Sequence, residues 1–301
     1  MSNLLLLIGC FIGGILLRRF QRMPDTGPAT LNSFIIHISL PALTLLHIHR
    51  LTLSENLWWT GAMPWLIFGL AAILFRVLAG WMRLEPLTTG ALILTAGLGN
   101  TSFVGVPMVG AYFGDQGLPT AIVADQLGSF LVLSILGIPL ANLYGEGGSS
   151  WAQIPRRILK FPPFIALVVA LLLRPLAYPD WWEVLLMRLG DTLAPLALVS
   201  VGMQLKLGEI AAYRRELALG LGFKLILAPL MIYLLYIQLL GFRGLDMQVT
   251  LFEAAMPPMI TAAIVASEHR LNPPLANLMV AIGIPLSFVT LHVWWLLLSQ
   301  L

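Results

Sequence analysis

The polar residues best suited to chemistry lie inside runs that are otherwise apolar. Residues 97–107 read Gly-Leu-Gly-Asn-Thr-Ser-Phe-Val-Gly-Val-Pro, which sets Asn100, Thr101 and Ser102 among glycines and ahead of Pro107. Glycine and proline weaken a helix, and the backbone groups that a break frees cannot stay unpaired in lipid. Such a break must therefore face protein or a wet cavity, where it can bind a solute or an ion.

A second break of the same kind is predicted nearer the C-terminus. Pro257 and Pro258 remove two backbone donors, and Glu253 lies one turn before them. Two interrupted helices at matching places are the best sequence indication of a binding site in a transporter. The alternative is a pair of structural kinks, because Pro and Gly are frequent in membrane helices.

Three ionisable residues also lie inside apolar runs, where charge is costly unless it is paired, neutralised or bound to an ion. Asp125 and Glu253 could bind a cation through oxygen or carry a proton, and Asp125 could instead make a structural hydrogen bond. Lys224 could contact a substrate carboxylate or pair with Asp191 or Glu253. The residues alone leave these alternatives open.

The composition indicates which kind of secondary structure holds these residues in place. Of 301 residues only 10% are charged and 58% are hydrophobic, with a mean hydropathy of +0.89; soluble domains carry about 25% charged residues. Long Leu-rich and Ala-rich runs predict membrane helices rather than the short alternating strands of a barrel. We attribute the net charge of +3 to Lys and Arg residues that orient the protein in the membrane, and not to nucleic-acid binding. A single cysteine, Cys10, excludes a disulfide framework within the chain.

Apolar runs and their breaks predict ten membrane spans with loops too short for a soluble domain. Most Lys and Arg residues fall on one side, which predicts that both termini lie outside an inner membrane. The predicted spans are residues 3–19, 29–49, 57–78, 87–112, 118–143, 161–178, 182–204, 217–240, 247–267 and 274–299.

The polar stretch at 145–150 divides these spans into two groups of five, and an odd number of spans gives the two groups opposite orientations. We therefore predict an inverted repeat, with one half at 1–144, a linker at 145–160 and the other half at 161–301. The Pro107 break would then match Pro257 and Pro258 at an offset of about 150 residues.

Several motifs together resemble the auxin efflux carrier family, within a superfamily that also holds the bile acid sodium symporters. The resemblance implies an all-α protein of ten helices in two inverted five-helix repeats, with broken helices 4 and 9 crossing, and an elevator-type motion. It also implies organic-anion substrates, among which malate and malonate suit a bacterial member. The motifs are Ser39-Leu40-Pro41-Ala42-Leu43, Gly99-Asn100-Thr101-Ser102-Phe103-Val104-Gly105-Val106-Pro107, Asp125-Gln126 and Met256-Pro257-Pro258.

The resemblance also suggests roles for individual residues. Asn100, Thr101, Asp125 and Glu253 are similar to the sodium ligands of the symporter branch, so they are the predicted ion-coupling residues, with sodium or a proton as the ion. The residues predicted to bind substrate are Asn100, Thr101, Ser102, Pro107, Lys224, Pro257 and Pro258.

The predicted function is thus secondary transport of a small carboxylate across a lipid bilayer, by a single chain or a homodimer. No cofactor is expected apart from a coupling sodium ion. An uncoupled uniporter or channel, including one for auxin-like aromatic carboxylates, is the alternative. An intramembrane protease is disfavoured because the spans contain no HExxH or GxSxG pattern and no paired aspartates.

Overall fold

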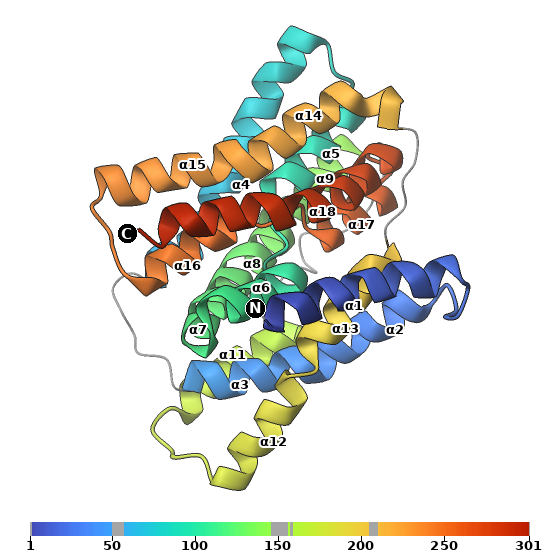
Figure 1. Ribbon diagram of the computed structural model, residues 1–301. Coiled ribbons are helices and arrows are strands. Elements are labelled where there is room, and N and C mark those ends of the chain that lie inside the picture. Colours follow the sequence, from blue (N-terminus) through green and yellow to red (C-terminus); the bar gives the residue numbers. More distant parts are fainter. Residues whose placement is uncertain (1, 50–56, 146–155, 157–158, 205–209, 301) are drawn as a thin grey trace. The chain divides into compact units, whose positions relative to one another are not determined.

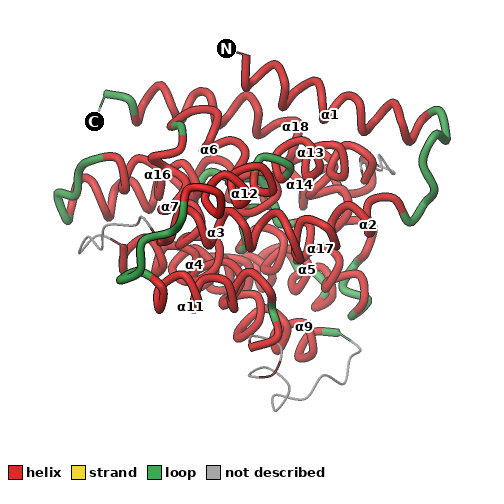
Figure 2. The backbone as a smooth tube through the Cα atoms, turned by 90° about the horizontal axis from the view of Figure 1, so that it is seen from below, coloured by secondary structure: helices red, strands yellow, loops and turns green. Residues whose placement is uncertain are grey.

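The computed structural model describes residues 2–49, 57–145, 156, 159–204 and 210–300. Apart from one isolated bridge, the regular structure in these ranges is helical (Figure 2). The prediction of an all-α polytopic membrane protein is confirmed, while the ten-span inverted repeat stays a prediction. Among the described residues, six helical segments are long and apolar enough to cross a membrane: Gly27–His49, Leu57–Met82, Asp115–Tyr144, Asp180–Gln204, Ile210–Leu239 and Pro273–Leu298.

The chain divides into two compact units, which are described separately. Each unit combines residues from both predicted repeat halves. The two units therefore do not correspond to the two halves, and the inverted repeat remains a prediction. Most of the predicted linker 145–160 lies outside the described residues. Unit 1 consists of Met1–Ser54, Ser102–Ile122 and Pro155–Leu205, and unit 2 consists of Glu55–Thr101, Val123–Ile154 and Lys206–Leu301.

Unit 1 is built around a close pair of helices, α1 and α13, which run side by side (Figure 1). A Cβ added at Gly14 would collide with the backbone of Val199, and one added at Gly202 would collide with the backbone of Phe11. Glycine on both helices therefore permits the contact. The helices of unit 1 are α1 (Ser2–Arg19), α2 (Gly27–Phe34), η1 (Ile35–Ser39), α3 (Leu40–His49), α6 (Val106–Phe113), η3 (Asp115–Gly117), α11 (Pro162–Leu173), α12 (Asp180–Gly190) and α13 (Leu193–Gln204).

Unit 2 contains both helix breaks and the three ionisable residues that the sequence singled out, Asp125, Lys224 and Glu253. Two helices span its boundary with unit 1, η2 (Thr101–Gly105) and α7 (Leu118–Val123). Its other helices are α4 (Leu57–Met82), α5 (Pro86–Gly97), η4 (Ala124–Ser129), α8 (Phe130–Val132), η5 (Leu133–Gly137), α9 (Ile138–Tyr144), η7 (Ile210–Tyr213), α14 (Arg214–Gly222), η8 (Phe223–Leu227), α15 (Ala228–Tyr233), η9 (Leu234–Leu239), α16 (Leu245–Ala254), α17 (Ile260–Glu268) and α18 (Pro273–Leu298).

Small residues bring the prolines of unit 2 into close contact with neighbouring helices. A Cβ at Gly128 would collide with the ring of Pro64 in α4, and one at Gly283 in α18 would come within 2.6 Å of the ring of Pro258. The π-helical segments η4 and η8 contain Asp125 and Lys224. A π-helical segment inserts an extra residue into an α-helix and so changes the direction of the side chains that follow it. Such segments are frequent at functional sites.

Candidate functional site

Both predicted helix breaks are present, and their backbones pair with each other. The first lies at residues 98–100 and not, as predicted, at Pro107, because the segment Thr101–Phe113 is helical through this proline. Helix α5 ends at Gly97 and α16 ends at Ala254. The Asn100 amide donates to the Pro257 carbonyl over 2.8 Å, and the Met259 amide donates to the Leu98 carbonyl over 3.0 Å. An antiparallel bridge also joins residues 99 and 258. We call this pairing of residues 98–100 with residues 257–259 the crossover. Backbone groups freed by the breaks thus find partners inside the protein, as a membrane requires.

Glu253 is a buried carboxylate beside this crossover. Its side chain is 1% exposed, and within the described ranges neither carboxylate oxygen accepts a hydrogen bond. The Ser129 hydroxyl, on η4, is likewise buried without a hydrogen-bond partner there. Leaving such groups unsatisfied costs free energy, so these buried oxygen atoms are candidates for contact with a bound ion or water.

Asp125 has a different environment from Glu253. The Thr101 hydroxyl donates to its Oδ1 atom over 2.7 Å, and both side chains are buried. This bond fixes the first residue of η2 to η4 inside unit 2. The structural hydrogen bond weighed for Asp125 is therefore present.

Lys224 extends from η8 and is also 1% exposed. Its Nζ atom donates to the Ala254 carbonyl over 2.8 Å. Glu253 accepts no hydrogen bond from it, and Asp191, the other partner considered from the sequence, is exposed in unit 1. The partner that the structure gives this lysine is thus a backbone carbonyl at the end of α16.

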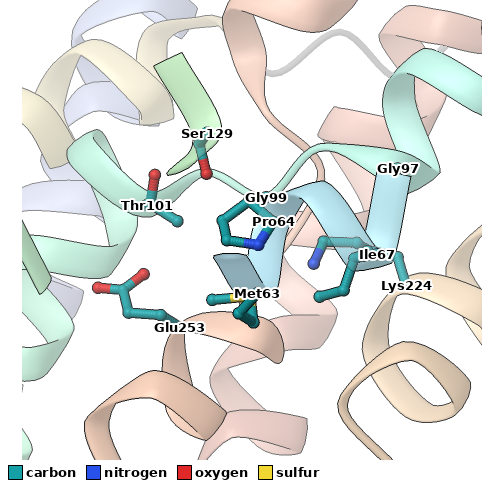
Figure 3. A pocket seen from close by; sticks show the side chains of 9 residues that line it. All are labelled: Met63, Pro64, Ile67, Gly97, Gly99, Thr101, Ser129, Lys224 and Glu253. Carbon is teal, nitrogen blue, oxygen red and sulfur yellow. The ribbon is translucent and has the colours of Figure 1, made fainter. Parts of the chain in front are cut away.

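These groups line a small cavity of about 10 Å³ in unit 2 (Figure 3). Glu253 and Thr101 lie on one side in this view, and Lys224 extends in from the other. A single water needs roughly 10–15 Å³ by this measure, so the cavity suits one small ion or water and not a dicarboxylate. The lining residues are Met63, Pro64, Ile67, Gly97, Gly99, Thr101, Ser129, Lys224 and Glu253.

The remaining predicted site residues fall in two groups. Asn100, Pro257 and Pro258 are buried at the crossover. Ser102 and Pro107 belong to unit 1, where Pro107 lines a separate cavity of about 280 Å³ together with Asp115 and Asp191. Their part in substrate binding stays a prediction.

Four residues that line the small cavity were not among those predicted from the sequence. Ser129 follows Asp125 by four residues, a spacing that places both on one helical face, and this signal could have identified it. Met63, Pro64 and Ile67 carry weaker signals, since only the proline interrupts the apolar run of α4. Their place at the site depends on the close packing of Pro64 against Gly128.

Comparison with known proteins identifies the family of this chain. A family described as "membrane transport protein" matches residues 1–146 and 149–295. An uncharacterized transporter of Methanothermobacter thermautotrophicus is 28% identical over 291 residues, covering 93% of this chain and 92% of the relative. An uncharacterized transporter of Methanocaldococcus jannaschii is 27% identical over 314 residues, covering 98% and 96%. The comparisons indicate a transporter and not an enzyme, and the chain belongs to the membrane transport protein family, that of the auxin efflux carriers.

Proposed function

We propose that this transporter moves a small organic anion, a carboxylate such as malate or malonate, by elevator-type alternating access. The observation that carries the proposal is the paired crossover inside unit 2. Two helices begin directly after it, at Thr101 and at Ile260. Helix N-termini present free amides and a partial positive charge, which attract carboxylates. The Asn100 side chain, buried at the same point, supplies a further polar group for the anion.

We further propose that one monovalent cation is coupled to the anion at Glu253. When all are ionised, the buried Lys224, Glu253 and Asp125 carry one positive and two negative charges, a net charge of −1. Binding one proton or one sodium ion would neutralise the cluster and lower the cost of holding it in a membrane. The cavity has room for one such ion, with Glu253, Ser129 and Thr101 supplying oxygen atoms.

Uptake of labelled malate and malonate into proteoliposomes tests this function, with sodium, proton and electrical gradients imposed one at a time. We expect accumulation driven by one cation gradient, with saturable counterflow. Flux that responds only to voltage would contradict coupling and favour an uncoupled uniporter. A lack of saturation and counterflow would favour a channel, and the absence of flux with either acid would reject this substrate class.

Two variants assign the roles within this assay. Glu253→Gln should remove the response to the cation gradient, whereas Glu268→Gln, which alters an exposed carboxylate of α17, should keep it. Asn100→Ala should weaken substrate binding by about tenfold or more, a loss of about 1.4 kcal/mol. The backbone bond from Asn100 to Pro257 is retained in that variant, so the crossover should persist. Unchanged affinity would remove Asn100 from the substrate site.

A further inference from the structure

The C-terminal ends of two broken helices line the cavity that the Lys224 side chain enters. Helix α16 ends at Ala254, whose carbonyl accepts the hydrogen bond from Nζ. Helix α5 ends at Gly97, and both Gly97 and Gly99 line the same cavity as Lys224. The last carbonyls of a helix have no partner within it and carry a partial negative charge. Two such ends beside one cavity favour a cation there.

The sequence explains why the Ala254 carbonyl is available. In a continuing helix this carbonyl would accept from the amide of residue 258, or from residue 257 in a tighter turn. Both positions are proline, which has no amide hydrogen. The proline pair thus leaves a buried carbonyl that must find another donor, and the Lys224 ammonium is that donor.

The glycine after α5 makes room for this ammonium. A Cβ built on Gly99 would lie 3.2 Å from Nζ and 3.4 Å from Cε of Lys224. These separations are shorter than most contacts of real Cβ atoms, so a larger residue at 99 would push the ammonium aside. The Lys224 side chain is therefore buried and closely packed beside the ends of the two helices.

We infer that the ends of α5 and α16 form a binding site for a small monovalent cation, and that the Lys224 ammonium permanently occupies it. The chain supplies one of its own cations, so any coupling ion binds on the Glu253 side of the cavity. Shortening Lys224 should open the helix-end site to a free organic ammonium ion. The consequence for coupling rests on the proposed function, whereas the binding site itself does not.

The test measures thermal unfolding of purified Lys224→Ala protein with added ethylammonium chloride. Ethylammonium should raise the melting temperature of this variant by several degrees and leave the wild type unchanged, because ligands that bind only the folded state stabilise it. Sodium chloride controls for ionic strength, ethanol for the uncharged ethyl group and tetraethylammonium for size. Lys224→Met is the matched control, since its uncharged side chain keeps the site filled and should not respond.

Three results would overturn the inference. They are a Lys224→Ala variant that ethylammonium does not stabilise, equal stabilisation of the Met variant, and stabilisation by ethanol as strong as that by the ammonium. If Lys224→Ala yields folded protein only when ethylammonium is present during purification, the inference is supported; no folded protein in either buffer counts against it. Because no organic anion is present, the result does not depend on whether malate or malonate is a substrate.

Discussion

At the scale of single residues, the Thr101–Asp125 hydrogen bond is the best defined polar contact of the site. Thr101→Val removes the hydroxyl donor and keeps the branched shape, so Asp125 Oδ1 loses a buried partner. We expect a loss of about 1–3 kcal/mol in stability, seen as a lower melting temperature of the purified protein. Thr101→Ser keeps the donor and should lie close to the wild type. Equal melting temperatures for the Val and Ser variants would contradict a stabilising bond.

The residues also differ in how far the sequence could predict them. Glu253, Asp125 and Lys224 were identified because ionisable groups are costly within apolar runs. Their contacts could not be predicted in the same way. The bond from Lys224 to Ala254 joins residues 30 positions apart, and it depends on how η8 packs against the end of α16. Neither the periodicity nor the composition of the sequence predicts how these two helices pack.

At the scale of elements, the proline pair determines where α16 ends. Pro258→Ala restores an amide at the position that a continuing helix would pair with the Ala254 carbonyl. We expect the new amide to compete with Lys224 for that carbonyl and to disturb the crossover, lowering uptake by about tenfold or more, which corresponds to about 1.4 kcal/mol. Uptake in proteoliposomes measures this change.

A second proline provides the control for that experiment. Pro273 stands in the first turn of α18, where the missing amide would have no helical partner in any case. Pro273→Ala should therefore leave uptake close to that of the wild type. Equal losses in the two variants would show that proline matters here for general stability and not for the end of α16.

The α1–α13 contact in unit 1 gives a prediction from two adjacent glycines. A Cβ at Gly14 meets the Val199 backbone, whereas one at Gly13 meets nothing within 4 Å. Gly14→Ala should lower the melting temperature because backbone atoms cannot move aside cheaply. Gly13→Ala should be neutral or slightly stabilising, because alanine favours a helix by about 1 kcal/mol over glycine. A similar fall in both variants would contradict the packing of these helices.

At the scale of the whole molecule, the sequence predicted the helical class, whereas the ten spans and their inverted repeat stay predictions. Long apolar runs correspond to helices because a membrane span needs about 20 apolar residues. Its backbone groups must also be paired within the segment, as they are in a helix. The positions of the breaks followed from Gly97, Gly99, Pro257 and Pro258, whose backbone properties are local. The division into two units could not be predicted, because each unit combines segments distant in the chain. That combination depends on helix–helix packing, which a linear pattern does not specify.

The proposed elevator motion requires each unit to move as a body, and cross-links within the units test this requirement. In unit 2 the Thr60 and Thr250 hydroxyls are 2.7 Å apart, and in unit 1 the Ser39 and Thr192 hydroxyls are also 2.7 Å apart. Because their hydroxyl groups are in contact, these two pairs are the positions chosen for replacement by cysteine. A Cys10→Ser background removes the single native thiol, so that only the introduced pair can form the bond.

We expect oxidation of either cysteine pair to leave uptake of the substrate anion within about twofold of the reduced protein, because a bond inside a rigid body does not oppose its movement. The same variants kept reduced by dithiothreitol serve as controls, and thiol labelling confirms that the bond has formed. Uptake that stops on oxidation and returns on reduction would show that α4 must move against α16, or η1 against the α12–α13 turn, during transport. The carrier would then rearrange inside a unit, and alternating access by movement of whole units would be rejected.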